Sequence, residues 1–113
     1  MKGDLLEFTA AGSPRALARA IEELARGLGT VTALVEPWAS DGTTLSMAVT
    51  SVKADGWAIE HTNLGTIRLA GLPGEQSRVI VAAEEAGHPE QARLLAVLDR
   101  FARELQSRLE VGR

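Results

Sequence analysis

Two stretches of the chain repeat their apolar residues with helical spacing. Over residues 14–28 the apolar positions recur every three or four residues, which places them on one face of a helix. Ser13-Pro14 is typical of a helix start, and Gly29 is typical of a helix end. A second pattern of this kind begins at His88-Pro89 and continues to about residue 110. The sequence therefore predicts two amphipathic helices, the second long enough to cross the whole molecule.

The apolar spacing becomes alternating between these helices and before the first one. Alternation is typical of strands with one buried face, and it occurs over residues 5–10, 30–35, 44–53 and 78–84. Asp55-Gly56 and Pro73-Gly74 are typical turn sequences. Between these turns, residues 57–72 would span about 50 Å as a single extended strand. We therefore expect this stretch to bend or break at Asn63-Leu64-Gly65.

These elements predict one α+β domain over residues 1–113, in the order β-α-β-β-β-β-β-α. We expect a curved antiparallel sheet of five or six strands, with the long C-terminal helix packed across it. Its apolar stripe is wider than the seam of a coiled coil, which favours packing on the sheet. The outer face of the sheet is expected to carry threonine and small residues, among them Thr44, Thr50 and Thr62. Exposure to solvent and pairing with a second subunit are equally good interpretations of that face.

The composition argues against several classes of protein. The chain has 12 Lys and Arg against 15 Asp and Glu, a net charge of −3, and no cysteine. This balance does not favour nucleic-acid binding, and the lack of cysteine excludes disulfides and thiolate metal ligands. No apolar run approaches the roughly 18 residues that a membrane span needs, and the N-terminus lacks the apolar core of a signal peptide. We therefore expect a cytoplasmic protein without a membrane span.

Residues suited to catalysis are few. The two histidines, His61 and His88, stand in none of the spacings typical of metalloproteases or serine hydrolases. Strand alternation predicts that His61 faces the core and that Glu60 points the other way. His88 with Glu84 and its acidic neighbours is more typical of a solvated edge than of a metal site. We expect no catalytic residues, no metal and no cofactor, while an enzyme using His61 with Glu60 or Asp41 remains a third hypothesis.

The order of the elements resembles the START-like superfamily, which has the helix-grip fold and includes the polyketide-cyclase-type domains. The resemblance lies in the stretch 64–69, the turn 72–75, the strand 77–81 and the helix 89–109. This chain has one helix over residues 14–28 where that superfamily usually has two. The resemblance implies a cavity between sheet and closing helix that binds an apolar or amphipathic small molecule. The implied wall consists of Met47, Val49, Trp57, Ile59, His61, Ile67, Leu98, Phe101 and Leu105.

Two main functional hypotheses follow. The first is non-catalytic binding of a small apolar or amphipathic ligand in that cavity. The alternative is an oligomerisation or protein-interaction module, with a homodimer formed through the outer sheet face or an edge strand.

Overall fold

The computed structural model describes residues 4–41, 43–84 and 91–111. Its elements follow one another as β1 (Asp4–Ala11), α1 (Pro14–Leu28), β2 (Val31–Val35), the short 3-10 helix η1 (Pro37–Ala39), β3 (Thr44–Asp55), β4 (Ala58–Leu72), β5 (Gln76–Ala83) and α2 (Gln91–Leu109).

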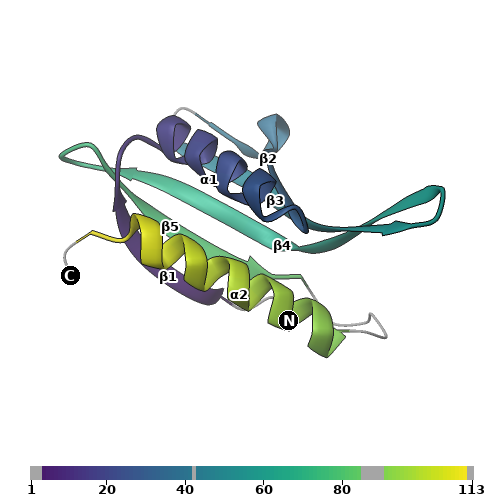
Figure 1. Ribbon diagram of the computed structural model, residues 1–113. Coiled ribbons are helices and arrows are strands. Elements are labelled where there is room, and N and C mark those ends of the chain that lie inside the picture. The colour runs from purple at the N-terminus through teal and green to yellow at the C-terminus, as the bar shows by residue number, and fades with distance from the viewer. Residues whose placement is uncertain (1–3, 42, 85–90, 112–113) are drawn as a thin grey trace.

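The strands form one open antiparallel sheet in the order β1-β5-β4-β3-β2. Strands β2 to β5 follow one another as a meander, and β1 joins the far edge beside β5. Helix α1 connects β1 at one edge with β2 at the other, and both helices lie on the same face of the sheet (Figure 1). The predicted α+β class and antiparallel sheet are confirmed.

Both predicted helices are present. At the start of α1 the Ser13 hydroxyl oxygen accepts a hydrogen bond from the Ala16 amide at 3.2 Å. At its end Gly29 has φ of 76°, and its amide donates to the Ala25 carbonyl at 3.3 Å. These are the cap and the left-handed terminal residue that the sequence predicted. The predicted first residues of the second helix, 88–90, lie outside the described residues.

Strand β4 is continuous, so the sheet of the described residues has five strands, the lower of the two expected numbers. In its pairing with β3, Gly65 lies opposite Val49 and Asn63 opposite Thr50, so Leu64 is an extra residue. A bulge of this kind bends a strand and shifts its alternation by one residue without ending it. The predicted irregularity at Asn63-Leu64-Gly65 is therefore a bulge, and the sheet has five strands rather than six. The predicted order had six strands because it divided residues 57–72 into two, and this division was wrong.

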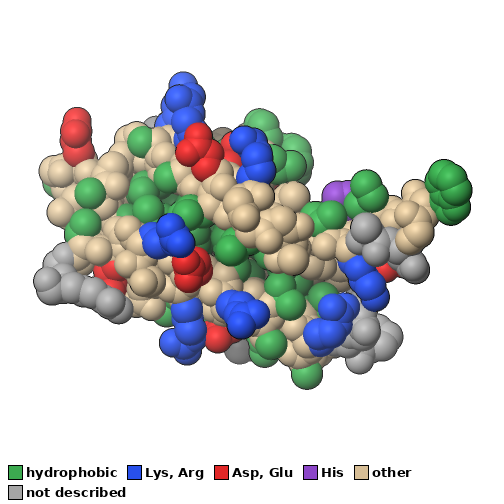
Figure 2. All heavy atoms as spheres, in the orientation of Figure 1, with side chains coloured by type: hydrophobic (Ala, Val, Ile, Leu, Met, Phe, Trp, Pro, Cys, Tyr) green, Lys and Arg blue, Asp and Glu red, His purple; other side chains and the backbone are tan. Residues whose placement is uncertain are grey.

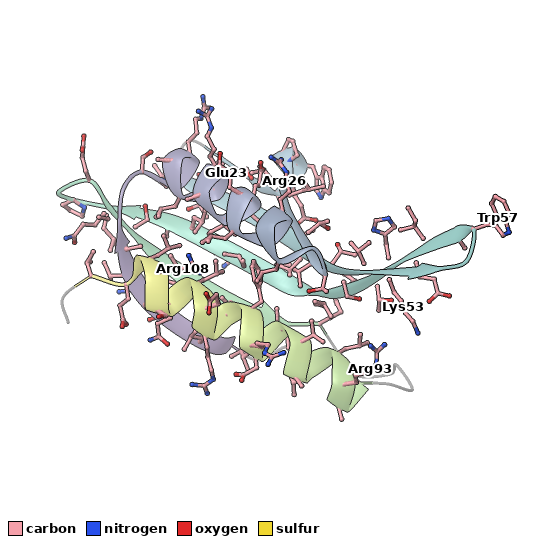
Figure 3. The ribbon with its side chains drawn as sticks, in the orientation of Figure 1. Glu23, Arg26, Lys53, Trp57, Arg93 and Arg108 are labelled. Atoms are coloured by element: carbon pink, nitrogen blue, oxygen red, sulfur yellow. The ribbon has the colours of Figure 1, made fainter. Side chains whose placement is uncertain are left out.

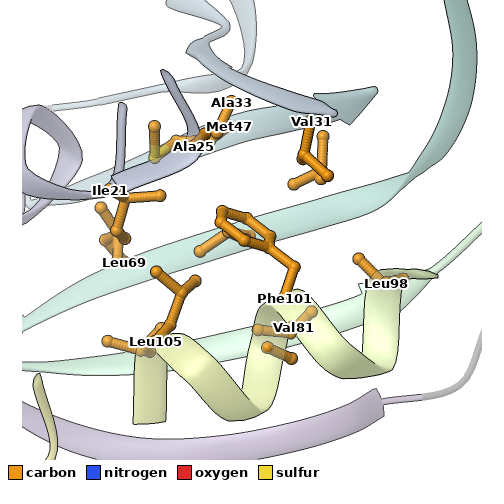
Figure 4. Close-up of a cluster of buried hydrophobic side chains, with 14 of the residues drawn as sticks. Ile21, Ala25, Val31, Ala33, Met47, Leu69, Val81, Leu98, Phe101 and Leu105 are labelled. Atoms are coloured by element: carbon orange, nitrogen blue, oxygen red, sulfur yellow. The ribbon is translucent and has the colours of Figure 1, made fainter. Parts of the chain in front are cut away.

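The core fills the space between the sheet and the two helices. Six of the predicted cavity-lining residues face this space with exposed fractions of 1% or less, namely Met47, Val49, Ile67, Leu98, Phe101 and Leu105. Figure 4 shows the Phe101 ring reaching from α2 toward Val31 and the side chains beneath α1. The inward orientation predicted for these six residues is confirmed. Their side chains pack against one another as parts of a single hydrophobic cluster.

Candidate functional site

Strands β3 and β4 extend beyond the rest of the sheet. The pairing of β3 with β2 ends where Ser51 lies opposite Val31, and the next amide, of Val52, donates to the Thr30 carbonyl at 2.9 Å. On the other side, the pairing of β4 with β5 begins at Gly65. Residues 53–63 therefore form a two-stranded projection, here called the distal hairpin, which leaves the body of the molecule in Figure 1.

The side chains of Trp57, Ile59 and His61 do not face the core. Trp57 has a relative exposure of 105% and Ile59 of 64%, and His61 is also exposed. Figure 3 shows Trp57 at the tip of the distal hairpin, pointing away from the body. The inward orientation predicted for these three residues was wrong for two reasons. The Leu64 bulge reverses the alternation, and the hairpin extends beyond the packed core.

The opposite face of the distal hairpin borders an open cleft. This cleft has a volume of about 1010 Å³ and lies between the hairpin, α2 and the segment joining α1 to β2. Its lining consists of Leu28, Thr30, Val31, Ser51, Val52, Lys53, Glu60, Thr62, Arg93, Ala96, Val97, Arg100, Phe101 and Glu104. Phe101 is the one residue that this lining shares with the predicted cavity wall. Thr62, expected on the outer face, lines the cleft because of the same bulge.

One side of α2 forms a complete wall of the cleft. Its lining residues are spaced by three or four positions, which is the spacing of a single helical face; they are Arg93, Ala96, Val97, Arg100, Phe101 and Glu104. Val97 is partly buried and Phe101 is buried, so together with Val31 they give the cleft an apolar floor. Ala96, Ser51 and Thr62 are small and leave the space above that floor open.

Charged side chains surround this floor. Lys53 lies on the hairpin, and Arg93 and Arg100 lie on α2. Figure 3 shows Lys53 on the side of the hairpin that faces α2, above Arg93. Figure 2 shows Lys and Arg side chains gathered over α2 and below the hairpin, next to apolar surface. The cleft thus combines an apolar floor with a basic rim.

Two carboxylates also line the cleft. Glu104 accepts a hydrogen bond from Arg108 Nε at 2.7 Å, so its charge is largely balanced within α2. Glu60 lies opposite Lys53 in the strand register, on the same face of the hairpin. Within the described part of the chain, neither Lys53 nor Arg100 forms an ion pair within 4.0 Å.

The residues considered for catalysis, Glu60, His61 and Asp41, do not lie together at one site. Glu60 lines the cleft, whereas the adjacent His61 lies on the other face of the strand. Asp41 belongs to a turn, where its Oδ1 accepts hydrogen bonds from the Thr43 and Thr44 amides, both at 2.8 Å. These amide donors, with the Thr43 hydroxyl, lower the pKa of the Asp41 carboxyl below its usual value of 3.8.

No group of three or more His, Asp or Glu side chains suited to metal binding occurs in the described ranges. Glu84 accepts a hydrogen bond from the Asn63 side chain at 2.8 Å. The other residues weighed for a metal site, 85, 88 and 90, lie outside the described residues.

Comparison of this chain with protein-family models, curated proteins and solved structures finds no match. The START-like resemblance therefore stays a prediction. Neither helix of the described chain has the combination of length and apolar character needed to cross a bilayer.

The sequence contained a weak signal for this cleft. Arg93 and Arg100 are seven residues apart and border the apolar stripe of the closing helix, so they lie on one side of it. Glu60 was not predicted as a lining residue because its orientation depends on the Leu64 bulge. Lys53 shares the alternation of Met47 and Val49 on β3, which has no extra residue, so strand alternation could have identified it.

Proposed function

We propose that this protein binds a small apolar or amphipathic molecule in the cleft between the distal hairpin and α2. The observation that carries the proposal is an open cleft with apolar side chains at its floor, of which Val97 is partly exposed. Ligand sites in proteins have volumes of roughly 300 to 1,000 Å³, are mostly apolar and carry a few polar groups. The volume of about 1010 Å³ lies at the upper end of that range, and the lining combines apolar residues with polar and charged ones.

The proposed site differs from the cavity that the resemblance implied. That cavity would lie under the centre of α2, where Met47, Leu98 and Leu105 fill the space and are 0% exposed. The cleft lies at the side, near the N-terminal half of α2. A ligand would therefore enter from the side and contact Val97, above the buried Phe101, without separating the helix from the sheet.

Backbone amide shifts measured by NMR test this proposal directly. Titration with dodecanol, dodecanoate and the dye 8-anilinonaphthalene-1-sulfonate is expected to shift the amides of Thr62, Val97 and Phe101. These shifts should saturate, and the amides of η1 should change little. Shifts scattered over the whole surface, or none at all, would contradict the proposal.

A pair of variants separates occupation of the cleft from a general change in the protein. Ala96 is exposed and lines the cleft, so Ala96→Phe is expected to fill part of it and abolish saturable binding. Ala16 is also exposed and lies on α1, near the helix end far from Leu28. Ala16→Phe is the matched control and should bind like the unmodified protein. Equal binding by both variants would place the ligand elsewhere.

A second proposed function is self-association through the distal hairpin. Trp57 and Ile59 are strongly exposed there, and no strand of the described chain pairs with the outer edges of the hairpin. Unpaired strand edges are templates for pairing. Two copies of one edge can pair in antiparallel orientation about a two-fold axis, which makes a second copy the natural partner.

Sedimentation velocity over a range of protein concentrations tests self-association. A dimer is expected, and Ile59→Lys should shift it to monomer by placing a charge in the paired surface. Leu34 is 61% exposed on β2, so Leu34→Lys is the matched control and should leave the dimer intact. A monomer at every concentration would refute this second function and leave the first untouched.

A further inference from the structure

We further propose that the ligand of the cleft is an amphipathic carboxylic acid. Its carboxylate would lie between Lys53 and Arg100, and its apolar tail would lie on Val97, above the buried Phe101. This inference rests on the proposed small-molecule function and adds the chemical class of the ligand.

The first argument is the placement of the positive charges. Arg93 and Arg100 are seven residues apart, so they occupy the same side of α2, separated by about 10 Å along its axis. Lys53 faces them from the hairpin wall (Figure 3). Both walls of one cleft therefore present cations to the same space.

The second argument is the balance of charge in the lining. Of the two carboxylates, Glu104 is already bonded to Arg108, which leaves Glu60 to balance Lys53 and Arg100. The lining is therefore positive, although the whole chain has a net charge of −3. Clefts of one sign attract ligands of the opposite sign. A cationic ligand would instead meet like charges on both walls.

The third argument is the geometry of the donors. A guanidinium group offers parallel N–H donors that match the two oxygens of a carboxylate. Arg100 forms no ion pair with another described residue, so its donors are not engaged by a carboxylate of that part of the chain. Phe101 follows Arg100 directly and belongs to the apolar floor. The head-group donor and the tail surface are thus adjacent on one helix.

Isothermal titration calorimetry with three ligands of equal chain length tests the head group. Dodecanoate, dodecanol and dodecyltrimethylammonium are compared below their micelle concentrations. Dodecanoate is expected to bind at least about tenfold more tightly than the other two, and added salt should reduce this preference. Equal affinities would overturn the carboxylate inference while leaving the proposed function in place. No binding by any of the three would overturn the proposed function itself.

Two charge-removing variants identify the residues responsible. Lys53→Gln and Arg100→Gln are each expected to weaken dodecanoate binding by at least about fivefold and leave dodecanol binding unchanged. Arg15 is exposed near the start of α1, and Arg15→Gln removes the same charge as a matched control. Circular dichroism confirms the fold of each variant. The inference is overturned if the double variant of Lys53 and Arg100 binds dodecanoate like the unmodified protein.

Discussion

Strand β4 passes through two regions of opposite character. From Gly65 to Leu72 it lies in the body of the sheet, where Ile67 and Leu69 are fully buried beneath the helices. Before the Leu64 bulge it belongs to the distal hairpin, where Ile59 is 64% exposed. A similar apolar side chain is therefore buried in one half of the strand and exposed in the other.

The difference lies in what covers each half. Over the body, large side chains from both helices meet the sheet and fill the space, as Ile21 and Phe101 do in Figure 4. Beside the hairpin, Ala96, Ser51 and Thr62 are too small to close the gap. The filled half belongs to the hydrophobic core, and the open half borders the cleft in which we propose that a ligand binds. Four measurements test or refine this contrast.

Hydrogen exchange along β4 should show the largest difference. Hydrogen-bonded amides between Thr66 and Ala70 are expected to exchange through global unfolding, with an opening free energy of about 5 kcal/mol or more. Amides of residues 59–62 should open locally at about 2 kcal/mol or less, because a two-stranded hairpin is marginally stable on its own. Similar protection in both halves would contradict the contrast.

Truncation of α2 on its two sides should show the next largest effect. Leu105 is 0% exposed, so Leu105→Ala is expected to lower the free energy of unfolding by about 2 to 5 kcal/mol. Leu95, on the same helix, is 41% exposed, and Leu95→Ala should cost about 1 kcal/mol or less. Urea denaturation measures both variants. Equal losses would show that the packed face of α2 is misassigned.

A methyl group added at the boundary between the two halves of β4 should have an intermediate effect on the free energy of unfolding. At Gly65 an added Cβ would collide with the backbone carbonyl oxygen of Ala82. Gly65→Ala is therefore expected to cost about 2 to 3 kcal/mol, and the affinity of the cleft should fall as the bulge shifts.

Gly27 provides the matched control for this change. It lies in α1, where an added Cβ meets no atom within 4 Å. Gly27→Ala is expected to stabilise the protein by about 0.5 to 1 kcal/mol, because alanine favours a helix more than glycine does. Thermal unfolding compares the two variants, and a neutral Gly65→Ala would disprove the close approach of β4 to β5.

The turn that contains Asp41, beside the Gly71 end of β4, should show the smallest effect on stability. Its carboxyl has a lowered pKa in the folded state, so its stabilising contribution is complete above the unfolded pKa and is lost as pH falls through the folded pKa. The melting temperatures of the unmodified protein and Asp41→Ala should differ slightly above about pH 5 and converge in acid, below about pH 4. A difference that grows in acid would contradict this assignment.

The amino-acid sequence determined the local elements of this protein. Ser13, Pro14 and Gly29 marked the ends of α1 because capping and glycine conformations act within a few residues. The apolar stripe of α2 identified Leu98, Phe101 and Leu105 as core residues, because the helical period is fixed by the backbone. The α+β class and the antiparallel direction of the strands were predicted from the same periodicities and from the turn sequences.

Tertiary structure decided the orientation of the distal hairpin and the position of the cleft. One extra residue at Leu64 moved Trp57, Ile59 and His61 to the outer face and brought Glu60 to the cleft, opposite Lys53 of β3. Strand alternation carries no information about where a bulge falls, because that depends on how neighbouring strands pair. Whether a gap is filled depends likewise on side chains from several elements that are distant in the sequence. The chain therefore encodes its core locally, while its candidate binding site arises from the assembled fold.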